Sequence, residues 1–357
     1  MSELHQEESG TSGEGKRVRR YWRPKHIDLS MVSVLFGVGL LFTFFFVFLF
    51  CWYTRNPLAS LPRASAVPVL VKVQAERRDH RIFQRVSLFD KILGDINFAL
   101  SLPDPLPNQR LPVVFVIGGL GTGEHSLRFV QDMGNNAIVG YDWPLPTRFS
   151  RNIGVRHILT LRTRVLSVPG QVSAILIWLI AQPWSDPTRI SVLGFSLGAM
   201  VTPAADRIAA TQGLRVGWTV LAYGGAPIGA VIRGNQRLHP AWLRLLLAFS
   251  AGCVLRPIDP AEHLPHLDGH FLVLTGAEDT IVSEKASARL VELTPVPKQV
   301  IRQLGNHIGT GPDHQAVTES AIEITRRWLT AEGAINPTTS KNQTSSMLPT
   351  SSSDFPK

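Results

Sequence analysis

Cysteine and charge are both scarce in this chain of 357 residues. The 2 cysteines, Cys51 and Cys253, lie far apart in the sequence, so the chain has no disulfide framework. Charged residues make up 18% of the chain, and none occurs between Asp28 and Arg55. The sequence also has no internal repeat and no Walker pattern, which argues against a repeat protein and a phosphate-binding loop of that type.

The basic charge is concentrated in one place. The formal net charge is +9, which could indicate nucleic acid or a membrane surface as a partner. Six of the cationic side chains, however, fall within residues 16–25, and no later segment interleaves basic and aromatic residues. We therefore expect no nucleic-acid partner.

An uncharged apolar segment follows this basic cluster. Residues 29–53 are longer than the roughly 20 apolar residues that a transmembrane helix requires. A buried core helix would show a polar stripe, and a cleaved signal peptide has a shorter apolar region of about 7–15 residues. We expect an uncleaved signal anchor, with a disordered cytoplasmic tail at 1–28 and the rest of the chain on the exoplasmic side, periplasmic or extracellular.

The rest of the chain divides into three parts. Residues 54–66 have the composition of a linker, and residues 333–357 form a Ser/Thr-rich tail that we expect to be disordered. Between them, residues 67–332 alternate apolar strand patterns with amphipathic helix patterns, which is typical of an α/β fold with a mostly parallel sheet. The expected strands are 67–73, 96–102, 112–118, 137–142, 189–195, 218–224, 271–276 and 299–304, and the expected helices are 171–182, 197–210, 283–293 and 314–331.

One expected strand runs directly into the motif G-x-S-x-G. The motif is Gly194-Phe195-Ser196-Leu197-Gly198, and an expected helix begins immediately after it. A tight strand-to-helix turn crowds the backbone around the serine, and glycine two residues before and after it relieves that crowding. We therefore predict Ser196 as a nucleophile in the cleft at the carboxyl ends of the strands.

A second glycine-rich segment, Gly118-Gly119-Leu120-Gly121, follows an earlier strand. Attack on a carbonyl group creates an oxyanion, which requires preorganised N–H donors. We predict the backbone N–H groups of Leu120 and Leu197 as these donors. The alternative of a nucleotide cradle is weaker, because the segment has no lysine and does not fit G-x-G-x-x-G.

A serine nucleophile needs a base, and the base needs an acid that orients it. Asp279 follows the strand at 271–276, and His307 follows the strand at 299–304, so both should lie at the same sheet edge as Ser196. We predict Asp279 as the orienting acid and His307 as the base. Glu278 and His314 are the alternatives for these two roles.

These motifs, VIGGLG, GFSLGA, TGAEDTIV and GNHIG in this order, resemble the α/β-hydrolase superfamily over about residues 67–332. The dienelactone-hydrolase and prolyl-oligopeptidase-like esterase branches are the most similar. The resemblance implies an eight-stranded, mostly parallel sheet with helices on both faces, and acyl-enzyme hydrolysis with no cofactor; we assign no metal site. One departure is Gly118-Gly119, where the family often has His-Gly, so a histidine that would brace the oxyanion loop is missing.

Such a fold often carries a cap over its site, and we expect the cap at about residues 225–270. This insert contains HPAWLRLLLAFSAGCVLRP, an apolar stretch too short to span a bilayer. One interpretation is a cap helix packed on the core. The other is a surface that faces the bilayer and admits a lipid-like or otherwise hydrophobic acyl substrate.

The sequence thus predicts a single-pass, membrane-anchored serine hydrolase that cleaves a small-molecule or lipid-like carboxylic ester. Two alternatives stay open: a peptidase of the prolyl-oligopeptidase type, and a catalytically silent binding module tethered to the membrane. The missing propeller domain counts against the first, and the intact Ser, Asp and His count against the second. The sequence leaves the oligomeric state open.

Overall fold

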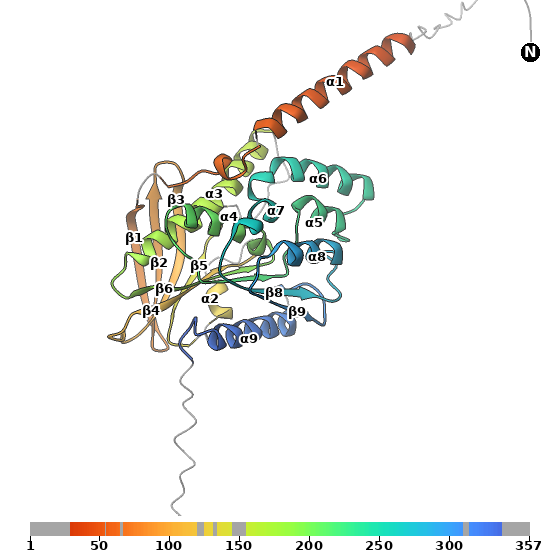
Figure 1. Ribbon diagram of the computed structural model, residues 1–357. Helices are drawn as coiled ribbons and strands as arrows, with labels where there is room; N and C mark the ends of the chain where they lie inside the picture. The colour runs from red at the N-terminus through yellow and green to blue at the C-terminus, as the bar shows by residue number, and fades with distance from the viewer. Residues whose placement is uncertain are drawn as a thin grey trace, which may run out of the picture. The chain divides into compact units, whose positions relative to one another are not determined.

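The computed structural model describes residues 29–53, 55–64, 67–119, 125–130, 134–144, 155–309 and 314–337. The chain divides into two compact units, residues 1–49 and residues 50–357, and each is described by itself. Figure 1 shows the arrangement of helices and strands within each unit.

Helix α1 covers the uncharged segment, and all but its last four residues belong to the first unit. The helix runs from Leu29 to Tyr53, the same bounds that the sequence predicts for the apolar anchor. Its described side chains include an apolar stretch, Phe36–Leu49, with large exposed side chains such as Phe36 and Phe44. The helix is thus established, and its insertion in a membrane stays a prediction.

The second unit is built around one sheet, which has nine strands in the described part of the chain. Their order across the sheet is β1-β2-β3-β5-β4-β6-β7-β8-β9. β4 to β9 pair in parallel, whereas β1, β2 and β3 form antiparallel pairs at one edge. The strands are β1 (Val69–Arg78), β2 (Arg81–Asp90), β3 (Gly94–Pro103), β4 (Leu111–Ile117), β5 (Ala137–Tyr141), β6 (Ser185–Phe195), β7 (Trp218–Ala222), β8 (His270–Gly276) and β9 (Lys298–Gln303).

The prediction of eight strands is wrong by one, because β2 was not expected. Its sequence, RIFQRVSLFD, mixes charged and apolar side chains, and it joins β1 through a two-residue turn, Asp79-His80. Both turn residues have positive φ, 47° and 61°, as the commonest tight β-hairpin turn requires. The turn lacks the Asn-Gly or Asp-Gly pair that usually announces such a hairpin.

Helices cover the sheet on both faces, as Figure 1 shows. Strand β4 illustrates why: Val113, Phe115 and Ile117 belong to one apolar cluster, and the alternate residues Val114 and Val116 belong to another. Because both faces of the strand are covered, its sequence is a continuous apolar run. The first cluster includes side chains of α3 (Val155–Ile180) and α4 (Leu197–Thr211), and the second includes side chains of α2 (Ser126–Phe129) and α9 (Gln315–Ala331).

Helix α3 contains a second apolar stretch, Thr160–Ile180, that is long enough to cross a membrane. An 18-residue window of this stretch is 72% buried inside the unit. Side chains such as Val172, Ile175 and Leu179 have no exposed surface. Burial of this kind is that of a core helix, so α3 shows that apolar length alone does not define a membrane span.

The insert between β7 and β8 folds into short helices. They are α5 (Ile228–Gly234), α6 (Ala241–Val254), η3 (Arg256–Ile258), α7 (Pro260–His263) and η4 (Leu264–His266). The insert contacts α4 through η3 and α7, and it contacts α8 (Glu284–Leu293) through α5 and α7. It therefore packs on the α3–α4 side of the sheet, on the face opposite α9 (Figure 1).

Candidate active site

Ser196 occupies the sharp turn between β6 and α4. Its φ of 55° and ψ of −116° are strained for a residue with a side chain. A Cβ at position 198 would lie 1.8 Å from the Ile117 carbonyl oxygen, and a Cβ at position 194 would lie 2.7 Å from the Ala199 Cα. Both glycines of the motif thus have a steric reason: Gly194 lets β6 approach α4, and Gly198 lets α4 approach the end of β4, while Ser196 stands at the tip of the turn.

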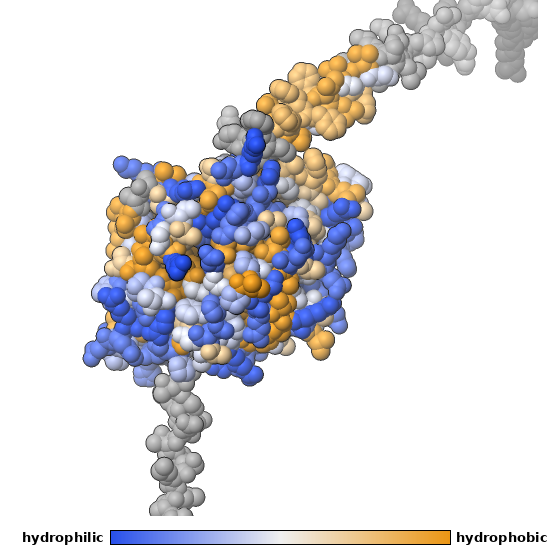
Figure 2. Space-filling model, in the orientation of Figure 1, coloured by the Kyte–Doolittle hydropathy of each residue, from blue (hydrophilic) through white to orange (hydrophobic). Residues whose placement is uncertain are grey.

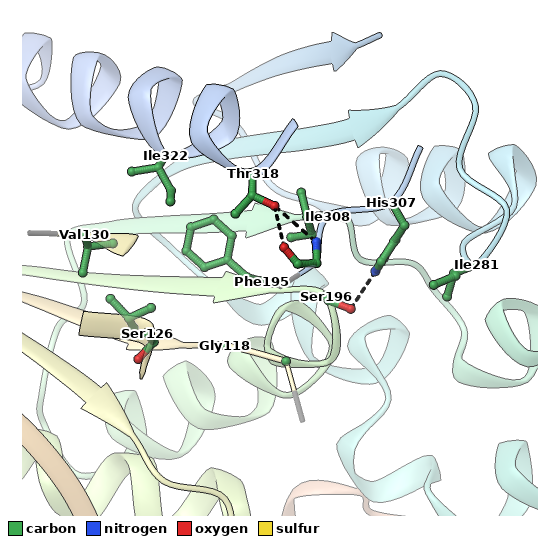
Figure 3. Close-up of a pocket in the computed structure, with 13 residues that line it drawn as sticks. Gly118, Ser126, Val130, Phe195, Ser196, Ile281, His307, Ile308, Thr318 and Ile322 are labelled. Carbon is green, nitrogen blue, oxygen red and sulfur yellow. Dashed lines mark hydrogen bonds between the residues drawn. The ribbon is translucent and has the colours of Figure 1, made fainter. Parts of the chain in front are cut away.

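A chain of short hydrogen bonds starts at this serine. The Ser196 Oγ lies 2.7 Å from His307 Nε2, and His307 Nδ1 lies 2.7 Å from Asp279 Oδ2. The side chains of His307 and Asp279 are only 3% and 5% exposed, so bulk water does not compete for these bonds. The structure thus brings together the three residues predicted as nucleophile, base and orienting acid (Figure 3 shows the first pair).

The Asp279 carboxylate is fixed on its other side by backbone groups. Its Oδ1 accepts hydrogen bonds from the N–H groups of Ile281 at 2.8 Å and Val282 at 2.9 Å. Asn306 links the two loops, because its Oδ1 accepts from the N–H of His307 at 2.7 Å and from that of Thr280 at 3.1 Å. These bonds orient the carboxylate and the imidazole before any substrate arrives.

The two alternative residues do not take part in this chain. Glu278 is exposed, and its backbone N–H binds the Gly305 carbonyl in a loop contact. His314 precedes α9, and its ring packs close to Gly309, where a Cβ would lie 3.0 Å from the imidazole Cδ2. The geometry therefore favours Asp279 and His307 over Glu278 and His314.

Tyr223 supports the imidazole from the side. Its ring meets that of His307 edge to face, with the centroids 5.7 Å apart. Burial and the nearby Asp279 charge raise the pKa of Tyr223 to about 12, so the hydroxyl stays neutral and donates to Gln303 Oε1 at 3.1 Å. Sequence analysis missed this residue, and its only local signal is a positive φ of 57°, which a sequence does not display.

The predicted oxyanion donors are placed in part. Leu197 is the first residue of α4, so its N–H is one of the helix-terminal groups that have no acceptor within the helix. Leu120 lies outside the described residues. Gly119, directly before it, lies beside the nucleophile, since a Cβ there would be 3.9 Å from the Ser196 Cβ. This end of the loop is braced by Trp143, whose Nε1 donates to the Gly118 carbonyl at 3.1 Å.

A cavity of about 290 Å³ opens beside the serine. Figure 3 shows Ser196 and His307 at one side and the apolar side chains of Val130, Phe195 and Ile322 at the other. The polar residues of the lining are Ser126, Ser196, His307 and Thr318, and most of the remaining wall is aliphatic or aromatic. The cavity therefore suits an apolar group bound next to the Ser196 hydroxyl.

The walls of this cavity come from β4, β6, α2 and α9, together with the loops that follow β8 and β9. Among the described residues that line it, none belongs to the insert at 225–270. The expectation that the insert caps the site is therefore corrected. The physical reason is that the insert packs around α4 and α8, whereas the cavity lies on the face that α2 and α9 cover.

Several solved structures share this architecture. Acetyl xylan esterase 1 from Thermoanaerobacterium sp. JW/SL YS485 aligns over 77% of this chain and 93% of its own, with 14% identity and a TM-score of 0.55. The acetyl xylan esterase from Paenibacillus sp. R4 covers the same shares with 17% identity and a TM-score of 0.54. The chain has the α/β-hydrolase fold.

A cold-adapted esterase from an Arctic intertidal metagenomic library has the hydrolase fold as well. It aligns over 73% of this chain and 99% of its own, with 13% identity and a TM-score of 0.51. No family model and no curated protein matches the sequence. At these identities the hydrolase fold is the shared property, and the chemistry has to be argued from the site.

Proposed function

We propose that this chain is a membrane-anchored serine hydrolase that cleaves carboxylic esters. The observation that carries the proposal is the hydrogen-bonded chain from the Ser196 hydroxyl through His307 to Asp279, with 2.7 Å at each step. The esterase names of the similar structures support the same reaction class.

The proposed reaction uses each residue in a defined step. The Ser196 Oγ attacks the ester carbonyl carbon while its proton passes to His307 Nε2, and the N–H of Leu197 with that of Leu120 stabilises the oxyanion. Collapse of this intermediate breaks the bond to the alcohol, which leaves with the proton from His307. Water then attacks the acyl-enzyme by the same route, releases the acid and restores the serine.

The substrate in this proposal is a small-molecule or lipid-like ester with an apolar acyl group. The aliphatic and aromatic wall formed by Val130, Phe195 and Ile322 supports this choice. A peptidase is the second candidate, and the matched peptide amide in the assay below distinguishes it from an esterase.

The anchor in this proposal is α1. Its 25 residues carry no charge and follow a basic segment, so the positive-inside rule places residues 1–28 in the cytoplasm and the hydrolase unit on the exoplasmic side. A reporter that is active in only one compartment, fused to the C-terminus, tests this orientation. Activity of the cytoplasmic reporter would overturn it.

Enzyme activity is tested with p-nitrophenyl acetate, butyrate and octanoate, using the full chain in detergent and its Ser196→Ala variant. We expect turnover by the native chain and loss of turnover in the variant, together with labelling of Ser196 by a fluorophosphonate. Absence of both turnover and labelling would favour a binding module. Turnover of a matched peptide amide in preference to the ester would favour a peptidase.

A further inference from the structure

Helix α6 of the insert exposes large apolar side chains, whereas its one buried residue is the small Ala248. Trp242, Leu245, Leu246 and Phe249 are 67%, 52%, 55% and 59% exposed, and their spacing of i, i+3, i+4 and i+7 places them on one face of the helix. We call these four residues the α6 face. Figure 2 shows apolar surface over this helix.

The side of α6 next to this face packs through small residues. Ala248 is buried, and Gly252 crosses Gly229 of α5 so closely that a Cβ at position 229 would lie 3.0 Å from the Ala248 carbonyl oxygen. A helix of a water-soluble domain normally directs its largest apolar side chains at the core. The reversed arrangement leaves a contiguous apolar patch of the kind that marks an interaction surface.

Cationic side chains border the α6 face. Arg233 and Lys285 line a groove that Leu245 and Phe249 also line, and Arg237 lies on the segment that leads into α6. All three are exposed and have no ion-pair partner among the residues that the structure describes. Apolar and tryptophan side chains with a basic border are typical of a helix that lies in the interface of an anionic bilayer.

The covalent connection to α1 also favours a lipid bilayer as the partner of the α6 face. Only residues 54–57 separate the end of α1 at Tyr53 from the helix η1 (Leu58–Ser60), and four residues reach at most roughly 14 Å. η1 packs on η3, which directly follows α6, and Leu61 beyond it is buried in the core. The chain that leaves α1 is therefore short, and it leads directly to η1, which packs against the segment that follows α6.

We propose that the α6 face docks onto the surface of the lipid bilayer that holds α1, with Trp242, Leu245, Leu246 and Phe249 among the lipids and Arg233, Arg237 and Lys285 at anionic headgroups. The proposal rests on the membrane anchor of the proposed function, and it is independent of ester hydrolysis. It makes the insert a device that holds the hydrolase unit on the membrane surface.

The test uses the full chain in vesicles of phosphatidylcholine and phosphatidylglycerol. In a background with Cys51→Ser and Cys253→Ser, a bimane label is placed at Leu245→Cys, and the matched control is Leu304→Cys, an exposed apolar position after β9. β9 and α6 lie apart in Figure 1. Doxyl groups on the lipid chains then quench any label that contacts them.

We expect the label at position 245 to lose most of its emission to the doxyl lipids and the label at position 304 to keep it. Leu246→Cys should respond like Leu245→Cys, and charge neutralisation by Arg233→Gln with Lys285→Gln should weaken quenching in vesicles rich in phosphatidylglycerol. A blue-shifted label at 245 that doxyl lipids do not quench, and that depends on protein density, would show a second copy on this face and overturn the proposal.

Alkaline carbonate extraction of the same vesicles tests the membrane insertion of α1 separately from the docking of the α6 face. If the protein resists extraction but its label at position 245 is not quenched, the docking proposal is overturned and the membrane anchor stands. If the protein is extracted and its label is not quenched, both proposals are overturned. Ester hydrolysis measured on the same samples reports on the enzyme function alone.

Discussion

Replacing Asp279 by asparagine changes one atom of the proposed catalytic chain and keeps its shape. The aspartate Oδ1 accepts two backbone N–H bonds, from Ile281 and Val282, and its Oδ2 lies 2.7 Å from His307 Nδ1. The asparagine oxygen has to take the place of Oδ1, because an amide NH2 there would face two donors. The NH2 group then points at His307 Nδ1.

This orientation of the amide changes the tautomer of the His307 imidazole. With a donor opposite it, His307 Nδ1 becomes the acceptor, and the proton sits on Nε2, the nitrogen that lies 2.7 Å from the Ser196 Oγ. His307 can then no longer accept the serine proton. A base held in the wrong tautomer lowers kcat by about 10⁴, which corresponds to about 5 kcal/mol of transition-state stabilisation.

The assay is kcat and KM for p-nitrophenyl butyrate with Asp279→Asn, and with Glu278→Gln as the matched control. Glu278 is adjacent and exposed, and its side chain is absent from the hydrogen-bonded chain, so its amide variant should keep kcat within about twofold of native. Thermal unfolding of both variants shows whether each is folded. A folded Asp279→Asn enzyme with a tenth or more of native kcat, or an equal loss in both variants, would refute the reasoning.

The other predictions concern the glycines near Ser196, a buried carboxyl group and the cavity wall. Gly198→Ala should lower the free energy of unfolding by at least about 3 kcal/mol, because its methyl group would lie 1.8 Å from a carbonyl oxygen, whereas Gly119→Ala meets nothing nearer than 3.9 Å. Equal melting of these two variants would contradict the steric argument. Burial raises the pKa of the Asp206 carboxyl to about 7, so the folded state keeps a proton that the unfolded state releases near pH 4. The stability that the native chain gains from this bound proton is complete below pH 4 and is lost as the pH rises to 7, by up to about 4 kcal/mol. The melting temperature of Asp206→Asn relative to that of the native chain should therefore rise from pH 4 to pH 8. A difference in melting temperature that does not change with pH would contradict this reasoning. Ile322→Trp should fill the apolar end of the cavity and lower kcat/KM for octanoate far more than for acetate, and an unchanged ratio would mean that the acyl group binds elsewhere.

The sequence was sufficient to predict the strands and turns that form the hydrogen-bonded chain. Ser196, Asp279 and His307 each follow a parallel strand, and continuous apolar runs made those strands visible. Once the strands are parallel and adjacent, their carboxyl ends meet at one edge, so the three side chains converge without knowledge of any distance. The sequence favoured Asp279 and kept its neighbour Glu278 as the alternative, and the coordinates show that the Asp279 carboxylate is the one that faces the imidazole.

Features that depend on contacts between distant segments could not be predicted in this way. Trp143 reaches the Gly118 carbonyl from the segment after β5, and Tyr223 meets His307 from the turn after β7. Neither residue belongs to a motif, and neither position shows a periodic pattern. Strand β2 was missed for a different reason, since its alternation of charged and apolar residues is broken and its hairpin turn has no glycine.

The position of the insert separates contact with the bilayer from selection of the acyl group, two properties that the sequence analysis had assigned to the same insert. The cavity beside Ser196 is walled by α2 and α9 on one face of the sheet, and the insert packs around α4 and α8 on the other. Substitutions on the α6 face should therefore change how the unit meets a bilayer while kcat for a water-soluble ester stays at the native value. Substitutions such as Ile322→Trp should do the opposite. An α6-face variant that altered acyl-chain preference toward soluble esters would mean that the insert reaches the site after all, and the two faces would have to be treated as one binding surface.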